Sequence, residues 1–530
     1  MMLVNVRRGC LVTACGAVSL FALTVPLSAH AAAASGAGDA ELPGEISEAD
    51  LRAAVTDPAT RRFYDRVHWR AVWNAAAIQA LRQALSGRAA HGLDHVTFLQ
   101  DSGADATIAQ REAAFTGAAL RYAAALGKGV VDPASLHSVY TLARPDLDVV
   151  GGLATALERG ELARWLDGLA PQDAAYAKVS DAYLAAVAEA GQGDDAGPRI
   201  DTTGVVRAGD TDPRVPAIVR QLQAQGYMVA GGTSATPPVE GGLPVYASRV
   251  YTDRIVDAVR QMQRDYGLAE DGVLGPRTIA VLNLRPADRA RAIAVALERL
   301  RWLARNPPAT RIDVNIAAAI LYYYRDGVLV DSRKVIVGKP GKETPMLLSP
   351  IYRLVANPTW TIPKSIERSE LAHVGPKYLA SHNMVRRGGY IVQRPGPDNA
   401  LGMVKFDMIN DRAIYLHDTS APGLFERSQR HLSHGCVRVE GALGFAQRIA
   451  EDEGVADRWQ SASAGGKHTF VDLPVRIPVR LLYQNAFVDE AGHVTVRADP
   501  YDWNGPVSRA LGFDDGAHAR AQADTVDIGP

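Results

Sequence analysis

Cysteine is the scarcest residue of this sequence, with three copies in 530 residues. Two of them, Cys10 and Cys15, lie in an N-terminal stretch with the features of an export signal: two arginines, an apolar run, and small residues that end at Ala31. Cleavage after Ala31 would leave Cys436 as the single thiol. Because one cysteine cannot form an internal disulfide in an oxidising compartment, Cys436 is either an inert buried thiol or a free thiol whose chemistry is used.

Residues 1–31 are therefore predicted to be a signal peptide that directs the protein to the periplasm. Two other interpretations remain open. The apolar run is about long enough to stay in the membrane as an anchor. Cys15 also follows a sequence that loosely resembles a lipoprotein cleavage site.

The sequence also lacks an excess of charge of either sign. It has 57 Lys and Arg against 58 Asp and Glu, which gives a formal net charge of −1, and no basic run stands out. This composition provides no electrostatic reason to expect binding to nucleic acid. After the N-terminal stretch there is no second apolar run long enough to span a bilayer. The length predicts about three or four globular domains, each able to bury a core.

Residues 45–200 are predicted to form a helical domain. Alanine-rich windows there carry apolar residues at three- and four-residue steps, which is typical of packed helices. Residues 191–212 have the glycine-rich and polar composition of a linker. An aromatic cluster has helical spacing, which favours core packing over a binding platform; it comprises Phe63, Tyr64, Trp69 and Trp73.

A small three-helix module is predicted for residues 211–284. Its apolar residues repeat at helical spacing, and Asp271-Gly272 and Gly275-Pro276 mark two tight turns before the last helix. The sequence of residues 258–283 also resembles the peptidoglycan-binding domain found beside cell-wall enzymes, because its glycines and its aspartate fall at the turn positions of that family.

Residues 311–505 are predicted to form a mainly β domain. Up to about residue 418, short segments rich in β-branched and aromatic residues are separated by glycine-containing turns. Further on, a helix is expected at about residues 441–453, with one face formed by Leu443, Ala446, Gln447 and Ala450.

Two strands are expected near the C-terminus, at residues 475–483 and 494–496. We expect them to pair as a hairpin that turns at residues 490–492. The polar, alanine-rich residues 512–530 are predicted to be a disordered tail.

Cys436 stands in the motif Ser433-His434-Gly435-Cys436-Val437-Arg438, with His417 and His431 upstream. Simple core packing is disfavoured because the flanking residues are poor core material. Three histidines and a cysteine could hold zinc, but their spacing is not that of a metal site. A redox thiol would lack a resolving cysteine. Attack by a thiolate, with His417 as a base brought alongside by strand pairing, accounts for more of the residues.

Several neighbouring residues have a use in thiolate chemistry. An imidazole can take the thiol proton. Gly435 lets backbone N–H groups approach an oxyanion, and Arg438 can hold a substrate carboxylate. The ring of His417 also needs an acceptor that orients it, which is either the side chain of Asp418 or a backbone carbonyl.

His417, fifteen intervening residues and the motif from Ser433 to Arg438 resemble the signature of the L,D-transpeptidases with a YkuD-type catalytic domain. Further segments resemble the large Gram-negative members of this family: residues 357–366, 395–406 and 477–479, and in the helical block Phe63-Tyr64 and residues 91–94. The resemblance covers nearly all of the chain after the signal. It implies a multidomain α+β protein with a helical scaffold domain, a three-helix peptidoglycan-binding module and a mainly β catalytic domain, of which residues 367–387 form a capping lid.

The resemblance also implies acyl transfer on peptidoglycan stem peptides, with no cofactor and no metal. In the family, a cysteine attacks the diaminopimelate carbonyl of a tetrapeptide donor and expels D-Ala, and an amine of another stem takes the acyl group. Carried over by motif, Cys436 is the nucleophile and His417 the base. The backbone carbonyl of Asp418 would orient the ring, and Gly435 and His434 would shape the oxyanion site. Substrate contacts are expected from Arg438, Tyr415, Ser433 and Trp360.

The acceptor stays open at this point. An amine of a second stem would give a 3-3 or a 1-3 crosslink, and a D-amino acid or an outer-membrane lipoprotein is an alternative. Water as the acceptor would make the protein an L,D-carboxypeptidase, and an inactive site would make it a wall-binding structural protein. The expected partners are peptidoglycan stem peptides and glycan, together with other cell-wall synthesis proteins.

Overall fold

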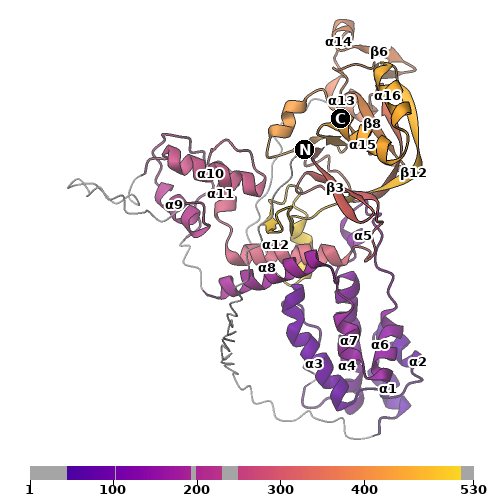
Figure 1. Cartoon of the computed structure of the whole chain (residues 1–530). Coiled ribbons are helices and arrows are strands. Elements are labelled where there is room, and N and C mark those ends of the chain that lie inside the picture. The colour runs from indigo at the N-terminus through magenta and orange to yellow at the C-terminus, as the bar shows by residue number, and fades with distance from the viewer. Residues whose placement is uncertain (1–44, 102, 193–197, 229–248, 515–530) are drawn as a thin grey trace, which may run out of the picture. The chain divides into compact units, whose positions relative to one another are not determined.

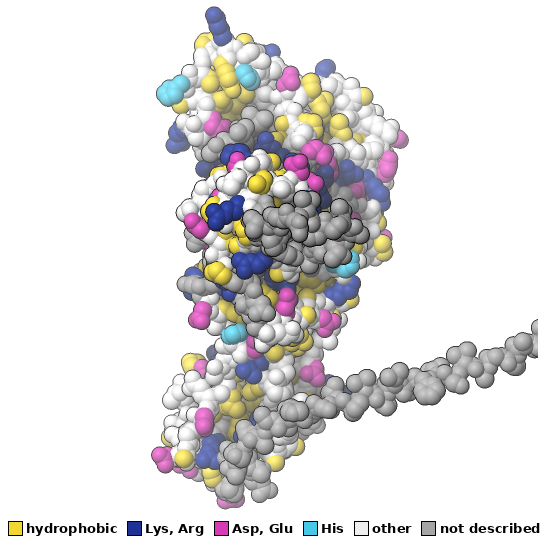
Figure 2. All heavy atoms as spheres, turned by 90° about the vertical axis from the view of Figure 1, so that its left-hand side faces the viewer, with side chains coloured by type: hydrophobic (Ala, Val, Ile, Leu, Met, Phe, Trp, Pro, Cys, Tyr) yellow, Lys and Arg dark blue, Asp and Glu magenta, His cyan; other side chains and the backbone are white. Residues whose placement is uncertain are grey.

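The computed structural model describes residues 45–101, 103–192, 198–228 and 249–514 (Figure 1). These residues all belong to one compact unit of the chain, which begins at Leu42. The predicted signal peptide and nearly all of the predicted tail lie outside the described residues. Within them, no helix is long and apolar enough to cross a membrane. On the face that Figure 2 shows, basic side chains lie among acidic ones, as expected of a net charge near zero.

The first part of the described chain is helical, as predicted. Its longer helices begin at side chains that accept a hydrogen bond from a backbone N–H of the first turn, such as Ser47, Asn74 and Thr107. The helices are α1 (Glu48–Ala54), α2 (Pro58–Arg66), α3 (Ala75–Ser86), α4 (Ile108–Lys128), α5 (Pro133–Leu136), α6 (Val149–Arg159), α7 (Leu162–Asp167) and α8 (Ala174–Gly191), with a 3-10 helix at Gly87–His91.

The aromatic cluster lies in the core of this helical domain. Phe63 and Tyr64 are fully buried, and Trp69 and Trp73 are nearly so. The Tyr64 hydroxyl lies 2.8 Å from Thr116 Oγ1, and Trp73 Nε1 donates to the same oxygen at 2.8 Å. The expected core packing is therefore confirmed, and the polar tips of the two rings have partners.

The small module also has its predicted helices: α9 (Val215–Ala224), α10 (Asp253–Tyr266) and α11 (Pro276–Leu282). They share a separate core. The predicted linker is shorter than expected, because its second half belongs to this module. Ile200 donates to the Asn283 side chain and accepts from it, each at 2.8 Å, and Val206 pairs with Leu274.

A mixed sheet of nine strands dominates the β domain, in the order β10-β3-β11-β9-β8-β4-β12-β1-β2. Because β3 also pairs with β2, the sheet closes on itself through β3. The strands are β1 (Arg311–Asn315), β2 (Ile320–Arg325), β3 (Val328–Gly338), β4 (Leu348–Ala356), β8 (Val404–Met408), β9 (Leu416–His417), β10 (His431–Ser433), β11 (Val437–Val439) and β12 (Thr469–Leu482).

The helix expected after Cys436 is α15 (Ala442–Asp452), and it packs on this sheet through a different face from the predicted one. Phe445 packs against Tyr323 and Phe406, with ring centroids 5.8 and 5.5 Å apart. Leu443, expected on the buried face, is 41% exposed. Ala446 and Ala450 are buried as predicted, but Leu443 is not, because the apolar stripe starts one residue earlier; it comprises Ala442, Phe445, Ala446, Ile449 and Ala450. Helix α16 (Ala456–Ala464) follows.

The predicted C-terminal hairpin exists, but the residues predicted for its first strand were wrong. β14 (Val494–Val496) pairs with β13 (Ala486–Val488). Residues 475–483 instead lie largely in β12, which has β4 and β1 as neighbours and therefore no free edge for a hairpin partner. The last helix is α17 (Asn504–Ala510), and the start of the predicted tail is packed, since the ring of Phe513 lies 4.2 Å from that of His95.

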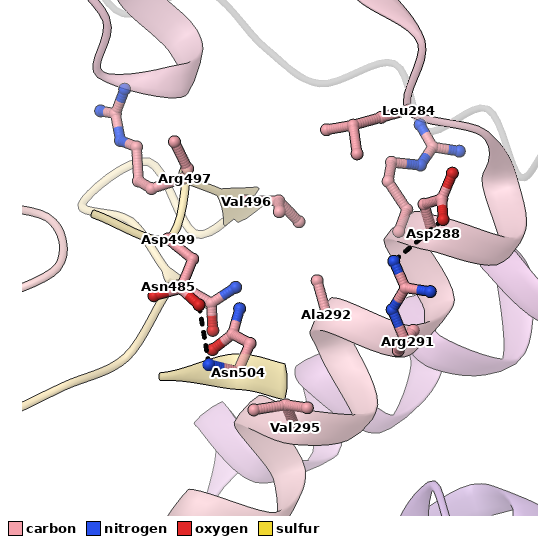
Figure 3. A pocket seen from close by; sticks show the side chains of 12 residues that line it. Leu284, Asp288, Arg291, Ala292, Val295, Asn485, Val496, Arg497, Asp499 and Asn504 are labelled. Carbon is pink, nitrogen blue, oxygen red and sulfur yellow. Dashed lines mark hydrogen bonds and ion pairs between the residues drawn. The ribbon is translucent and has the colours of Figure 1, made fainter. Parts of the chain in front are cut away.

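Helix α12 (Pro286–Arg301) lies beside α8 and links the module to the β domain (Figure 1). Figure 3 shows the pocket between α12 and the C-terminal hairpin, which has a volume of about 40 Å³. Its acidic groups already have partners: Asp288 pairs with Arg291 at 2.9 Å, and Asp499 accepts from the backbone N–H of Asn504 at 2.7 Å. This pocket is a packed joint and is too small for a substrate.

Residues 360–393 form a small subdomain with its own apolar core, and they include the segment predicted as a lid. Two helices, α13 (Lys364–Glu370) and α14 (Pro376–Ser381), accompany a three-stranded sheet. The strands are β5 (Trp360–Thr361), β7 (Tyr390–Gln393) and β6 (Met384–Arg387). Its core comprises Trp360, Ile362, Ile366, Leu371, Leu379 and Ile391, and Leu401 from the following segment completes it.

Candidate functional site

Strand pairing places Cys436 and His417 on the same face of the sheet. β11, which begins directly after Cys436, runs parallel to β9, so that Val437 lies opposite Leu416 and Arg438 opposite His417. Val437 and Leu416 are fully buried in the main core. Because side chains alternate along a strand, Cys436 and His417 point to the opposite face, as diagonal neighbours. The structure, which describes both side chains, records no hydrogen bond between them; such contacts often tighten only when substrate binds.

The turn that carries Cys436 is held by its own hydrogen bonds. The buried Ser433 hydroxyl donates to the Cys436 carbonyl at 2.6 Å and accepts from the Gly435 N–H at 3.1 Å. Gly435 has a φ of 119°, a backbone conformation that other residues rarely adopt. Its carbonyl accepts from Thr344 Oγ1 at 2.8 Å. Ser433, expected to contact substrate, therefore closes the turn, and the N–H of Gly435 is engaged within it.

The thiol of Cys436 is 9% exposed and donates to the carbonyl of Ala413 at 3.6 Å. Burial raises the pKa of the Cys436 thiol. Hydrogen bonding to Tyr415 and the positive charges of Lys405 and Arg438 lower that pKa in part. The backbone and hydroxyl of Tyr415 and two cations thus oppose the cost of burying a thiolate.

The imidazole of His417 is fully buried, and neither ring nitrogen has a hydrogen-bond partner of normal geometry among the described residues. Burial and the charge of Arg438 hold the pKa of His417 well below its usual value, while the backbone carbonyl of Asp418 raises it in part. The ring is therefore neutral at neutral pH and can accept a proton.

The side-chain carboxylate of Asp418 and its backbone carbonyl make different contacts. Its Oδ2 accepts from the backbone N–H of Met403 at 2.8 Å, and burial raises the pKa of this carboxyl. The glycine before Met403 is required here, because a Cβ atom on Gly402 would lie 2.4 Å from Asp418 Cγ. The side chain thus ties the loop before β8 to the histidine strand. Of the two acceptors that the sequence left open, the carbonyl is the one that affects the pKa of His417, and its role in orienting the ring stays a prediction.

Lys405 belongs to the site, and our sequence analysis did not single it out. It lies opposite His417 in the pairing of β8 with β9. Its ammonium stands 4.1 Å from the centroid of the Tyr415 ring and 2.7 Å from Asp407 Oδ1. The available signal was its place in the segment 395–406, which resembles the family.

Arg438 is fully buried on the face that carries Cys436 and His417. It was expected to hold a substrate carboxylate, yet its side chain is closed to solvent in this structure. Its charge acts on the two neighbouring groups, since it lowers the pKa of both His417 and Cys436. Arg438 therefore contributes a fixed positive potential to the site.

The lid subdomain touches the site through two of the predicted residues. His434 Nε2 lies 2.7 Å from Glu370 Oε1 of α13, with the two side chains 9% and 34% exposed. Tyr415 packs against the apolar core of the subdomain, to which Trp360 belongs. Trp360 itself is 5% exposed.

The three histidines near Cys436 do not gather around one point. His431 points elsewhere: its Nε2 lies 2.9 Å from the carbonyl of Ile316, and its ring packs on Tyr501. His434 pairs with Glu370, as described above. Among the described residues, no group of three or more His, Cys, Asp or Glu side chains is arranged to hold a metal ion.

Three family models match the chain. Residues 309–472 match the YkuD family, described as the L,D-transpeptidase catalytic domain. Residues 58–183 match the family described as a scaffold domain, and residues 211–282 match the family "Putative peptidoglycan binding domain". The three matches fall on the β domain with its lid, the helical domain and the small module.

One curated relative is the "Putative L,D-transpeptidase" of Haemophilus influenzae, which is 33% identical over 306 residues. The alignment covers 52% of this chain and 60% of that protein. Among solved structures, an L,D-transpeptidase of Stackebrandtia nassauensis is similar at 12% identity and a TM-score of 0.20, covering 54% of this chain and 96% of the other. One of Xylanimonas cellulosilytica gives 17% identity and a TM-score of 0.18, covering 53% and 98%. Structural similarity at these TM-scores carries no evidence beyond the matches to the family models.

Proposed function

Because the chain carries a YkuD-type L,D-transpeptidase catalytic domain at residues 309–472, beside a scaffold domain and a peptidoglycan-binding domain, we propose that it is a peptidoglycan L,D-transpeptidase that works through Cys436. The observation that supports this most directly is the register of β9 and β11. It brings the only cysteine of the described residues and a buried imidazole to one face of the sheet.

In the proposed first half-reaction, Cys436 attacks the diaminopimelate carbonyl of a tetrapeptide stem. His417 takes the thiol proton, and the thiolate that forms is stabilised by the charges of Lys405 and Arg438 and by the hydroxyl of Tyr415. The new C–S bond gives a tetrahedral oxyanion. As this intermediate collapses, the C–N bond to D-Ala breaks, and His417 returns the proton to the leaving amine.

The oxyanion needs backbone donors at the turn. The N–H of Gly435 already donates to Ser433, whereas the structure records no acceptor for the N–H of Cys436 among the described residues. We therefore assign the Cys436 N–H as the principal donor. Gly435 contributes the backbone conformation that presents this group, and His434 positions the turn through its contact with Glu370 of the lid.

In the second half-reaction an amine of another stem attacks the thioester and forms the crosslink. Peptidoglycan is the partner that the small module supports, since it matches a peptidoglycan-binding family. An enzyme of this kind works outside the cytoplasm, and the N-terminal sequence is suited to export, as a cleaved signal or as an anchor.

The test is to incubate the protein with a disaccharide-tetrapeptide and to identify the products by tandem mass spectrometry. We expect D-Ala release and crosslinked dimers from the wild type and neither from the Cys436→Ala variant. His417→Gln should lose activity as well, whereas His373→Gln, at an exposed lid histidine, should retain it. Crosslinks made equally well by Cys436→Ala would refute the mechanism. Tripeptide without dimers would assign an L,D-carboxypeptidase, and no product from the wild type would favour a wall-binding structural protein.

A further inference from the structure

The peptide group between Gly435 and Cys436 is held at one end by a buried hydroxyl. Its carbonyl oxygen, which belongs to Gly435, accepts a hydrogen bond from Thr344 Oγ1 at 2.8 Å. Its N–H, which belongs to Cys436, is the group that the proposed mechanism uses as the oxyanion donor. Because a peptide group is planar, its C=O and N–H point in opposite directions. A contact that fixes the carbonyl therefore also fixes the direction of the N–H.

The glycine at position 435 gives this contact its importance. Gly435 has a φ of 119°, and a residue without a Cβ atom moves between backbone conformations with little steric resistance. The peptide group that follows it can therefore rotate more easily than it could after another residue. Rotation would separate the carbonyl from the Thr344 hydroxyl and leave two buried polar groups without a partner, which opposes the rotation.

The Thr344 hydroxyl is itself fixed in direction. The side chain is fully buried, and its Oγ1 atom accepts from the backbone N–H of Gly338 at 2.9 Å. A hydroxyl has one proton to donate, and an N–H that points at its oxygen leaves that proton free for another acceptor. The proton of Thr344 is therefore directed at the Gly435 carbonyl.

The loop from Gly338 to Thr344 is packed against the turn that carries the nucleophile. Gly338 ends β3 and lies opposite Ser433 of β10, and the N–H of Lys339 donates to the Ser433 carbonyl at 2.9 Å. The loop then folds back closely, because a Cβ atom on Gly338 would lie 2.1 Å from the carbonyl oxygen of Lys342. Strand pairing thus places Thr344 beside the turn.

Tyr501, from the segment before α17, joins the two ends of this loop. Its hydroxyl accepts from the backbone N–H of Thr344 at 3.3 Å and donates to the carbonyl of Gly338 at 2.5 Å. Burial raises the pKa of Tyr501, so that the hydroxyl keeps its proton. The backbone N–H of Tyr501 donates to the hydroxyl of Tyr483 at 3.1 Å, and the two rings stack with centroids 5.4 Å apart. Tyr501 is therefore held in place as well.

We propose that Thr344 is a positioning residue for acyl transfer: its hydroxyl holds the Gly435 carbonyl so that the N–H of Cys436 points at the oxyanion, and Tyr501 keeps Thr344 in place. The inference rests on the proposed function. Neither side chain transfers a proton in the reaction, and both act through the peptide group. Donation to the carbonyl also polarises that group, which makes its N–H a stronger donor.

The test compares two reactions of Cys436 that differ in their need for an oxyanion donor. An ester, p-nitrophenyl acetate, acylates the thiolate through a tetrahedral oxyanion and releases p-nitrophenolate. Iodoacetamide alkylates the same thiolate by displacement of iodide, and no oxyanion forms. A change that only disturbs the fold, the thiol pKa or access to Cys436 alters both rates, whereas a misdirected N–H slows acylation alone.

We expect Thr344→Val, which removes the hydroxyl and keeps the shape of the side chain, to lower the acylation rate about ten- to hundredfold, since the donor is misdirected but still present. D-Ala release from a disaccharide-tetrapeptide should fall as well. The plateau rate and the pH midpoint of alkylation should stay at their wild-type values. Thr344→Ser, which retains the hydroxyl, should keep most of the acylation rate.

The matched control is Thr116→Val in the helical domain. Thr116 is also fully buried, and its hydroxyl also donates to a backbone carbonyl, that of Glu112 at 3.2 Å. This variant should keep the wild-type ratio of acylation to alkylation.

The same ratio decides the outcome for Thr344. If Thr344→Val slows both reactions equally, or slows neither, the positioning role is overturned. Should this variant not fold, Tyr501→Phe takes its place, with a smaller loss of acylation expected and an unchanged ratio as the contrary result. A wild type that the ester acylates but that releases no D-Ala would refute the proposed function alone, so that the two failures are distinguishable. A wild type that the ester does not acylate would overturn the positioning role.

Discussion

The contact between Glu370 and His434 joins the lid to the turn that carries the nucleophile, and replacing Glu370 by Gln should loosen the lid. The two groups are 2.7 Å apart and 34% and 9% exposed. A hydrogen bond from an imidazole to a carboxylate stabilises by about 0.5–1 kcal/mol more than one to a neutral amide. If the lid must open before a reagent reaches Cys436, Glu370→Gln should raise the open fraction about two- to fivefold.

The assay is the rate of Cys436 alkylation by iodoacetamide, followed on the peptide that carries this residue. Removal of a negative charge would also lower the pKa of a nearby thiol, so the rate is measured as a function of pH. Lid opening raises the plateau rate at high pH, whereas a charge effect moves only the midpoint. Hydrogen exchange of α13 should rise in parallel.

The matched control is Glu367→Gln on the same helix. Glu367 pairs with Lys364 at 2.6 Å and with Arg386 at 3.2 Å, both within the subdomain, and it does not contact the turn. Its plateau rate should stay at the wild-type value. The reasoning is refuted if Glu370→Gln leaves the plateau unchanged, or if Glu367→Gln raises it as much.

Two further predictions concern the groups behind the site. Lys405→Met should shift the pH profile of Cys436 alkylation to higher pH, because the Lys405 cation lowers the pKa of the thiol and its loss leaves less thiolate. Lys405→Arg should keep the wild-type profile. An unshifted midpoint for Lys405→Met would contradict this prediction. Gly402→Ala should lower the free energy of unfolding by about 2–4 kcal/mol, since the new Cβ would lie 2.4 Å from Asp418 Cγ in a left-handed conformation. Gly423→Ala, where nothing lies within 4 Å, is the control; equal denaturation midpoints for the two variants would contradict the prediction.

The sequence was informative wherever the signal is local. Helical spacing predicted the helical domain, and the turns at Asp271-Gly272 and Gly275-Pro276 predicted the small module. The motif around Cys436 and its distance from His417 were sufficient to propose a reactive thiol. All of these features depend on residues that are close in the chain, or on a pattern that a family shares.

The errors arose where contacts are distant in sequence. β12 was assigned to the C-terminal hairpin because it precedes that hairpin, whereas its actual partners are β4 and β1, more than a hundred residues upstream. Lys405 and Glu370 were not recognised for the same reason. The first reaches Tyr415 through the pairing of β8 with β9, and the second reaches His434 across the lid.

By itself, the sequence determined which chemical groups are available: one cysteine near a histidine, in a turn where a glycine provides a backbone conformation that other residues rarely adopt. The tertiary structure decided how these groups are used. The register of β9 and β11 put Arg438 beside His417 in the interior, where its positive charge lowers the pKa of both His417 and Cys436. It also brought Leu136–Val139 of the helical domain next to Arg412, where together they line a pocket. Burial and strand register depend on the whole fold, because each is set by side chains from distant parts of the chain that compete for the same interior.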